Sequence, residues 1–310
     1  MSITPSFNTL AQLRNFAQNK PKKGLFKRAR SKHITRQIMV RLASLQSPLQ
    51  QQYWNAYHCS DKLIQAGDEV TSRYCGTRGC NICNRIRTAK MMNGYSEQLK
   101  DLSDLNFVTL TIPNVKLCDL SYALNTMTSN AHKIQDLLRK KFRDVYGIRK
   151  LEITYNSAMD SYHPHFHIIV NGRDKANLIL SRWLKLNPMA NVKAQDIRAA
   201  DKNSLNELFK YTTKIEMKIG SSKVIYVNAL DAIFQNLRGR RTVQPFGMIR
   251  KICDEIETID DLKAQAQDLP YYDFMVWEYD VSDWVNGEGE VATGYFPIEN
   301  EFDFNFKKTM

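Results

Sequence analysis

Long apolar runs are missing from this 310-residue sequence. Its apolar segments, such as Ile168–Val170, are much shorter than the roughly 18 uncharged residues that a membrane span needs. The N-terminus also shows no apolar stretch followed by a cleavage site, so no secretory signal is visible and we expect a cytoplasmic protein. In that compartment the six cysteines are expected to be thiols or metal ligands rather than disulfides.

Acidic residues are absent from positions 1–50, which hold ten Lys and Arg. Positions 251–310 show the reverse, with four Lys and fifteen Asp and Glu, while the whole chain carries a formal net charge of +12. Surface charge that merely faces water is the simplest explanation of any such run. A basic N-terminal segment and an acidic C-terminal segment are nevertheless typical of a polyanion-binding protein with a separate interaction segment. This charge distribution favours nucleic acid as the partner.

Hydrophobic periodicity predicts an α+β protein. Alternating apolar residues indicate strands at Phe107–Ile112, Ile148–Tyr155 and His163–Val170, with an edge strand at Val192–Arg198. Helical spacing indicates helices at Leu120–Val145, Asp174–Leu186 and Ser204–Ile219. We therefore expect a central antiparallel sheet with helices packed on it, in addition to a cysteine segment that binds zinc.

The chain is expected to comprise four segments. They are a basic N-terminal arm and helix (1–50), a zinc-binding segment (51–100), the sheet domain (101–250) and an acidic, aromatic C-terminal segment (251–310). Eleven aromatic residues in the last segment argue against a freely solvated tail. We expect this segment to pack on its own chain, where it would compete with DNA for the basic body, or to recruit a host helicase or another protomer.

Four of the six cysteines fall within 25 residues, at Cys59, Cys75, Cys80 and Cys83. Four soft ligands with a C-x-x-C knuckle suit tetrahedral Zn²⁺, and four cysteines leave no open position, so a structural ion is expected. His58 is an alternative to Cys59 as the first ligand, and four unrelated cysteines are the simpler explanation. Arginines that surround the cluster are expected to lower the thiol pKa values and to bind phosphate: Arg73, Arg78, Arg85 and Arg87.

Three histidines alternate along one predicted strand, at His163, His165 and His167. Alternate residues of a strand share a face, and three imidazoles in a row pack poorly unless they hold a metal. If this strand pairs with the preceding one as a hairpin, Glu152 lies beside His165 and His167. Two histidines and a carboxylate with open positions suit Mn²⁺ or Mg²⁺ acting as a Lewis acid. An exposed strand residue is the ordinary explanation of Glu152.

A third group is predicted on the helix that begins near Ser204. Helical spacing of i, i+4 and i+7 brings Glu207, Tyr211 and Lys214 to one face, so a carboxylate, a phenol and an ammonium meet. A structural alternative exists for Glu207, because Ser204 and Glu207 have the spacing of a capping box. Tyr211 could likewise be a half-buried packing residue.

Five motifs in order resemble those of one family. They are CGTRGCNICNRIRTAK (75–90), FVTLTIPN (107–114), HPHFHIIV (163–170), ELFKYTTK (207–214) and QNLRGRRTVQPFG (235–247). The pattern resembles that of rolling-circle replication initiators of small plasmids, which are single-tyrosine members of the HUH endonuclease superfamily. The resemblance covers residues 55–250. It implies an HUH endonuclease domain with a ferredoxin-like sheet at 101–250.

The resemblance implies a role for each matching residue. His165 and His167 would be the HUH pair and Glu152 the acidic ligand of the catalytic ion. Tyr211 would attack origin DNA, exposed as a single strand or hairpin, to give a 5′-phosphotyrosine and a 3′-OH for a host polymerase. Lys214 would stabilise the phenolate of Tyr211, and Glu207 would activate the water that ends the cycle.

Phosphate contacts are expected from basic residues near the zinc segment and in the last motif: Arg85, Arg87, Arg238, Arg240 and Arg241. Two alternatives remain at this point. The same residues would serve an HUH transposase or a mobilisation relaxase, although such transposases are usually shorter and lack the cysteine segment. A non-enzymatic, zinc-containing DNA-binding regulator is the alternative from outside the enzymes.

Overall fold

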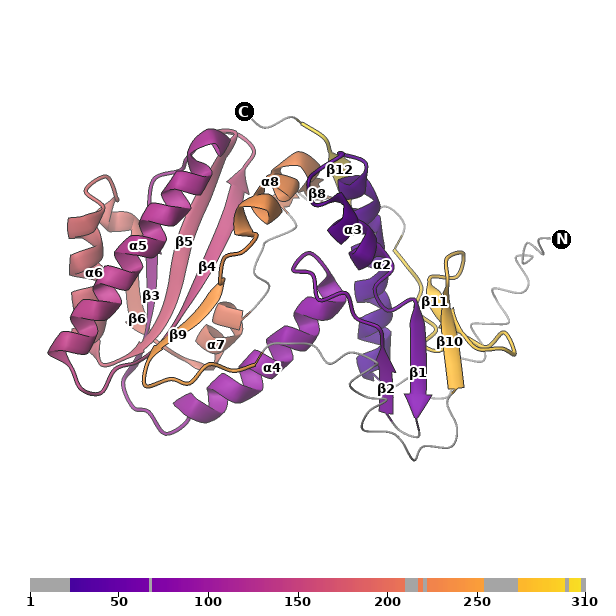
Figure 1. The fold of residues 1–310 in the computed structure, drawn as a ribbon, viewed down its shortest axis with the longest axis horizontal. Helices are drawn as coiled ribbons and strands as arrows, with labels where there is room; N and C mark the ends of the chain where they lie inside the picture. Colours follow the sequence, from indigo (N-terminus) through magenta and orange to yellow (C-terminus); the bar gives the residue numbers. More distant parts are fainter. Residues whose placement is uncertain are drawn as a thin grey trace. The chain divides into compact units, whose positions relative to one another are not determined.

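The computed structural model describes residues 23–66, 69–209, 217–219, 222–253, 273–298 and 301–307. Contacts between Cα atoms divide the chain into two compact units. The first unit contains Met1–Ile86 and Glu255–Glu301, and the second contains Arg87–Asp254 and Phe302–Met310. Helices and mainly antiparallel strands make up the described ranges, which confirms the predicted α+β class (Figure 1).

A five-stranded antiparallel sheet in the order β6-β3-β5-β4-β9 is the centre of the second unit (Figure 1). Its strands are β3 (Leu105–Thr111), β4 (Tyr146–Asn156), β5 (Ser161–Asn171), β6 (Asp196–Ala199) and β9 (Val243–Gly247). The three central strands match the predicted ones to within about two residues at each end. β4 and β5 form a long hairpin, which fixes the register of their side chains.

One face of this sheet is covered by three helices. They are α5 (Leu117–Lys141), α6 (Arg173–Leu186) and α8 (Val227–Leu237). Phe166 and Ile168 of β5 are buried against them, as the alternation of the strand predicts. Trp183 of α6 contacts Phe166 edge to face, with ring centroids 5.8 Å apart. This is the main hydrophobic core of the unit.

The opposite face carries a second, smaller core. Phe107, Ile148 and Ile169 pack there with residues of α4 (Asn81–Leu99) and α7 (Lys202–Phe209). Because side chains alternate along β5, this is also the face on which His165 and His167 lie. The sheet therefore separates its largest core from the histidines.

Two predicted elements differ from the structure. Within the predicted strand Val192–Arg198, the Asn191 side chain accepts a bond from Lys193 N, which closes a short 3₁₀ turn (Val192–Ala194) before the edge strand β6 begins. The predicted helix Ser204–Ile219 is wrong at its end, because Met217–Ile219 forms a strand, β7. Residues 210–216 of that prediction lie outside the described residues.

A three-stranded sheet in the order β12-β8-β7 completes the second unit. It consists of β7 (Met217–Ile219), β8 (Ser222–Tyr226) and β12 (Asp303–Asn305). β12 pairs with β8 in parallel, and Asn228 donates a bond of 2.7 Å from its amide to the carbonyl of Phe306. The end of the acidic segment is thus a strand of this unit.

In its described residues, the first unit combines α2 and α3 with a four-stranded antiparallel sheet in the order β11-β10-β1-β2 (Figure 1). Its elements are α2 (Lys23–Ala43), α3 (Gln50–Tyr57), β1 (Lys62–Ala66), β2 (Glu69–Ser72), β10 (Asp273–Glu278) and β11 (Asp283–Val285). Trp277 and Trp284 are buried in its core with ring centroids 4.8 Å apart. Within the described ranges, the acidic segment therefore packs on its own chain.

Ion pairs and ring contacts add to this packing. Arg30 of the basic helix α2 pairs with Glu301 at 2.5 Å. Arg36 lies 3.7 Å above the ring of Tyr279.

None of the helices in the described parts of the chain is long and apolar enough to cross a membrane.

Candidate functional site

The β4–β5 hairpin brings Glu152, His165 and His167 together. Glu152 lies directly opposite His165 in the register, and His167 is the next residue on the same face of β5. Glu152 Oε2 is 3.8 Å from His165 Nε2 and 3.7 Å from His167 Nε2. One ligand atom from each of the three residues lies within 4.8 Å of the others, so this cluster could hold a metal ion.

Hydrogen bonds at the far side of each ring orient the two imidazoles. His165 Nδ1 donates to the carbonyl of His163 at 3.1 Å, and His167 Nδ1 lies 3.2 Å from Thr109 Oγ1. The bond to the His163 carbonyl places the proton of His165 on Nδ1, so its Nε2 carries the lone pair, and the Nε2 atoms of both rings lie on the side of Glu152. Outer bonds of this kind fix the tautomer of metal-binding histidines, so the donor set fits a divalent cation.

Lys150 is a fourth member of this cluster. Its ammonium lies 3.4 Å from Glu152 Oε2, and its side chain is only 2% exposed. A buried ammonium balances the charge of a buried carboxylate. Lys150 belongs to no motif in the sequence, although it precedes Glu152 by two residues on a strand, and alternation alone puts both on one face.

His163 lies at the outer end of the histidine row. Its ring is 5.2 Å from that of His165, centroid to centroid, and faces it in a stack. Burial lowers the pKa of His163, and the neighbouring His165 lowers it further. His163 is not among the residues whose ligand atoms meet in the cluster.

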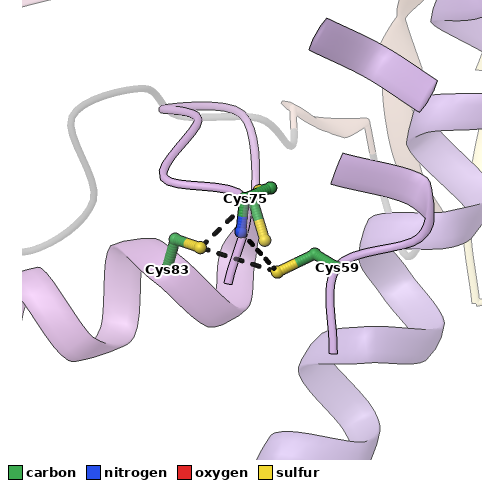
Figure 2. Close-up of side chains that lie close together, drawn as sticks. Cys59, Cys75 and Cys83 are labelled. Atoms are coloured by element: carbon green, nitrogen blue, oxygen red, sulfur yellow. Dashed lines mark hydrogen bonds between the residues drawn. The ribbon is translucent and has the colours of Figure 1, made fainter. Parts of the chain in front are cut away.

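Cys59, Cys75, Cys80 and Cys83 of the first unit form a second cluster. Figure 2 shows three of them, Cys59, Cys75 and Cys83. Cys83 Sγ lies 3.6 Å from both Cys59 Sγ and Cys75 Sγ, and all four sulfurs are within 4.8 Å of one another. A tetrahedral site with metal–sulfur bonds of about 2.3 Å has sulfur–sulfur edges of about 3.8 Å. The observed spacing is close to that value, so the cluster could hold a metal such as zinc.

His58 does not belong to this cluster. Its Nδ1 lies 2.8 Å from Asp61 Oδ2, and its side chain is exposed. Cys59 Sγ instead accepts a bond from the backbone N–H of Cys75 at 3.4 Å. The structure thus brings Cys59, not His58, to the other three sulfurs.

The thiol pKa values do not follow the expected effect of nearby arginines. Burial raises the pKa of Cys80 well above its usual value. Bonds from Cys59, Cys80 and Cys83 lower the pKa of Cys75. Neighbouring sulfurs and burial therefore set these pKa values, because four clustered sulfurs cannot all ionise without a cation among them.

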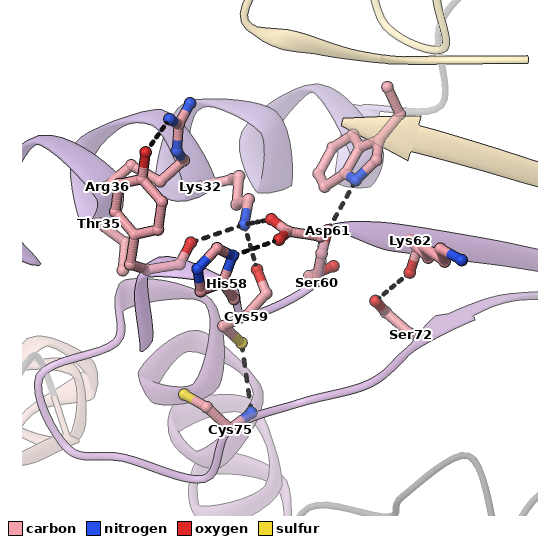
Figure 3. A network of polar contacts seen from close by, with 12 residues as sticks. Lys32, Thr35, Arg36, His58, Cys59, Ser60, Asp61, Lys62, Ser72 and Cys75 are labelled. Carbon is pink, nitrogen blue, oxygen red and sulfur yellow. Dashed lines mark hydrogen bonds and ion pairs between the residues drawn. The ribbon is translucent and has the colours of Figure 1, made fainter. Parts of the chain in front are cut away.

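Lys32 of α2 holds the loop that carries Cys59 (Figure 3). Its buried ammonium donates to the carbonyl of Cys59 at 2.7 Å, to the carbonyl of Tyr57 at 2.9 Å and to Asp61 Oδ1. Burial lowers the pKa of Lys32, while Asp61 raises it. On the other side of this loop, Trp284 Nε1 donates to the carbonyl of Ser60 at 2.8 Å. Hydrogen bonds from α2, in the basic N-terminal segment, and from β11, in the acidic C-terminal segment, therefore both hold the loop that carries Cys59.

Replacing Lys32 with Met is expected to destabilise the first unit by about 3 kcal/mol, because two buried carbonyls and Asp61 lose their donor. The melting temperature and the amount of metal bound per chain should both fall. Lys62→Met on β1, whose side chain is exposed, is the matched control and should change neither. A Lys32→Met protein with unchanged melting temperature would contradict this account of the loop.

Glu207 lies on α7, exposed, with its Oε2 2.7 Å from an Nη of Arg198. The capping-box alternative for Glu207 is wrong. Asp201 caps the helix instead, because Asp201 Oδ1 accepts from Ser204 N at 2.8 Å and Ser204 Oγ accepts from Asp201 N at 3.0 Å. Tyr211 and Lys214 lie outside the described residues.

The predicted phosphate-binding arginines lie in two places. Arg85 of α4 donates to the carbonyl of Lys27 at 2.9 Å in the first unit, and Arg87 is half-buried on the same helix. Arg238 and Arg240 line a cavity of about 410 Å³ after α8, with Ser121, Gln235, Asn236 and Gly239. Arg240 is held there by Asn125 Oδ1 at 2.7 Å, whereas Arg238 and the adjacent Arg241 are exposed.

Residues 69–279 match the model of the replication protein family, Rep_1, which is more than half of the chain. The chain belongs to this family of replication proteins. The Protein rep of Staphylococcus aureus is 29% identical over 175 residues, which are 50% of this chain and 76% of that relative. The Protein rep of Bacillus amyloliquefaciens is 25% identical over 285 residues, 77% of this chain and 80% of the relative. No solved structure matches.

These matches confirm the expected relationship to plasmid replication initiators of the Rep type. The matched part of the Rep chain includes Glu152, His165 and His167. It also includes three of the four clustered cysteines, whereas Cys59 precedes it. The motifs that carried the resemblance therefore lie inside the family match.

Proposed function

We propose that this Rep protein initiates rolling-circle replication of a plasmid by nicking one strand of its origin DNA. The observation that carries the proposal is the cluster of Glu152, His165 and His167 on one sheet face, in a chain of the replication protein family. The reaction is a strand transfer in which Tyr211 becomes covalently joined to DNA. The enzyme is thus a metal-dependent single-strand endonuclease and strand transferase of the HUH superfamily.

The donor chemistry of each cluster supports a different ion. Two imidazole nitrogens and one carboxylate oxygen suit Mn²⁺ or Mg²⁺, and a bound ion of this kind polarises the scissile phosphate. Four cysteine sulfurs suit a structural Zn²⁺. Lys150 and Thr109 support the first site by holding the carboxylate and the outer nitrogen of His167.

The first chemical step belongs to Tyr211. Its phenolic oxygen forms a bond to phosphorus as the bond from phosphorus to the 3′ oxygen breaks. The phenol gives up its proton and the departing 3′ oxygen gains one, so the strand ends in a 3′-OH while its 5′ phosphate stays on the tyrosine. Free tyrosine has a pKa of about 10, so the ammonium of Lys214 is proposed to stabilise the phenolate.

The closing step belongs to Glu207. Its carboxylate takes a proton from the water that cleaves the regenerated origin after one round of synthesis. Glu207 does not cap α7, and its side chain is exposed. The helix that carries it packs on the sheet face where the histidines lie, and both observations support this assignment. The 3′-OH freed in the first step serves a host polymerase, and unwinding calls for a host helicase.

Phosphate contacts outside the reaction are assigned to Arg85, Arg87, Arg238, Arg240 and Arg241. Lys and Arg contacts of this kind make affinity for DNA fall steeply as salt rises. Arg238 and Arg241 have exposed side chains, which supports such a contact.

The proposal is tested with a labelled single-stranded oligonucleotide that carries the plasmid origin. Cleavage is expected with Mn²⁺ and is expected to stop when EDTA is added. A protein that binds the oligonucleotide tightly but leaves it intact in Mn²⁺ would instead be a zinc-containing DNA-binding regulator, and the proposal would fail.

Replacing His167 with Gln is expected to weaken Mn²⁺ binding by about 100-fold or more, since a direct ligand matters at least as much as its supporting bonds. Isothermal titration of the full chain with Mn²⁺ measures this directly. His132→Gln is the control, because His132 is exposed on α5 and lies outside the cluster. Equal Mn²⁺ affinity in both variants would remove His167 from the site.

A further inference from the structure

We propose that Arg198 is a positioning residue for Glu207, which it holds in place for the closing step. The inference rests on the proposed function and adds a residue that the sequence motifs do not mark. Arg198 is the third residue of the edge strand β6, and Glu207 lies on the next element of the chain, α7.

Arg198 contacts the start and the second turn of α7 at once. One Nη donates to Glu207 Oε2 at 2.7 Å, and the other donates to Ser204 Oγ at 2.9 Å. Asp196 and Asp201 lie farther away, at 4.0 Å and 3.9 Å. Among these three carboxylates, Glu207 alone is within hydrogen-bond distance, so the guanidinium selects it.

The same guanidinium is also anchored on the sheet. Its central carbon lies 4.4 Å from the centroid of the Phe107 ring, and Phe107 is its partner in the β3–β6 register. The Phe107 ring is in turn 5.2 Å from the ring of His167. A chain of direct contacts therefore runs from Glu207 on α7 through Arg198 and Phe107 to His167, one of the three residues of the histidine cluster.

The ion pair between Arg198 and Glu207 contributes too little to stability to be explained by it, so we assign it a role in orienting the carboxylate. The side chains of Arg198 and Glu207 are 38% and 48% exposed, and an exposed ion pair contributes only about 0–1 kcal/mol to stability. A planar guanidinium that stacks on a ring and bonds through both ends is nevertheless rigid. It can hold a carboxylate in one direction where a flexible side chain on a short helix would otherwise rotate freely.

This arrangement affects one step of the cycle and not the other. The first cleavage uses Tyr211 and does not need a base on Glu207, whereas the closing step does. Misplacing a catalytic group by about 1 Å can cost about 100-fold in rate. Loss of Arg198 should therefore slow closure and spare the formation of the covalent adduct.

The test compares Arg198→Gln with the unaltered full chain in two assays. The first follows the covalent adduct on an origin oligonucleotide, and the second follows cleavage of a second oligonucleotide by the purified adduct. We expect adduct formation to change less than about threefold and closure to slow by about 10- to 100-fold. Arg198→Lys, which keeps the charge but not the two-ended fork, should recover only part of the rate.

Two further variants separate positioning from structure. Ser204→Ala removes the other partner of Arg198 and half of the helix cap, so it reports any effect of a loosened α7. It should slow closure much less than Arg198→Gln does, because the contact with the Phe107 ring still holds the guanidinium and loss of a cap contributes only about 1 kcal/mol. Glu207→Gln should be as slow in closure as the double variant with Arg198→Gln, because residues that act through one another are not additive.

Distinct results overturn the inference and the proposed function. Normal closure in Arg198→Gln, alongside slow closure in Glu207→Gln, would overturn the inference alone. Equal slowing in Arg198→Gln and Ser204→Ala would assign Arg198 to helix stability and would also overturn it. Failure of the unaltered protein to form any adduct would instead contradict the proposed function.

Discussion

Replacing Tyr211 with Phe should abolish the covalent protein–DNA adduct and leave DNA binding unchanged. Phe keeps the ring but has no oxygen to bond to phosphorus, and removing a nucleophile costs about 10⁴-fold or more in rate. Phosphate contacts from arginines elsewhere supply most of the affinity, so the dissociation constant should not move. Adduct is measured on a denaturing gel, and binding is measured by gel shift at fixed salt.

Tyr122→Phe is the matched control for this experiment. Tyr122 lies on α5 and is 75% exposed, so losing its hydroxyl disturbs neither the core nor the histidine face. The control should form adduct at the normal rate. Undiminished adduct in Tyr211→Phe would remove Tyr211 from the mechanism, whatever else the metal cluster does.

Removing the metal from the cysteine cluster should unfold the first unit. Structural zinc contributes about 10–16 kcal/mol in small zinc-binding domains, which is as large as the net stability of most domains, about 5–15 kcal/mol. Cys59 lies in the loop that Lys32, Trp277 and Trp284 also contact, so the loss should spread to the tryptophan core. Tryptophan fluorescence during titration with a zinc chelator follows this unfolding.

Cys59→Ser should reproduce the effect of the chelator, with less than one zinc per chain. Cys118→Ser is its control, because Cys118 is exposed and lies outside the cluster. A chelated protein that keeps its fluorescence and its thermal transition would contradict a structural role for the ion.

The histidine cluster was predictable from the sequence because strand geometry is local. His165 and His167 share a face by alternation, and the short turn between β4 and β5 fixes which residue of the first strand faces them. Glu152 follows from that register. Lys150 follows by the same rule, although a lone lysine on a strand gives no signal of its own.

The cysteine unit was predictable only in part. The spacing of Cys75, Cys80 and Cys83 marks a metal site, but nothing near them in sequence indicates that Lys32 fastens the loop or that β10 pairs with β1. The β1–β10 pairing joins segments separated by about 200 residues, and both contacts depend on the whole fold. The charges of the two segments made packing of the acidic segment on its own chain one of two alternatives, and the individual contacts, such as Arg30 with Glu301, come from the structure.

The helix start near Ser204 shows how one motif can have two interpretations. Ser204 and Glu207 have the spacing of a capping box, yet Asp201 has the same spacing to Ser204 and supplies the cap. Spacing alone therefore leaves the position of the helix N-cap uncertain by about one turn. Arg198, which decides how Glu207 is held, lies on a different element and carries no motif.

The most direct test of the proposed reaction is to locate the bond between protein and DNA. The unaltered chain is incubated with Mn²⁺ and an origin oligonucleotide, digested with protease and nuclease, and its peptides are analysed by mass spectrometry. We expect a single modified peptide in which Tyr211 carries a 5′-phosphorylated nucleotide, and none when EDTA is present. DNA attached to another residue, or cleavage that leaves no attached nucleotide, would contradict the mechanism.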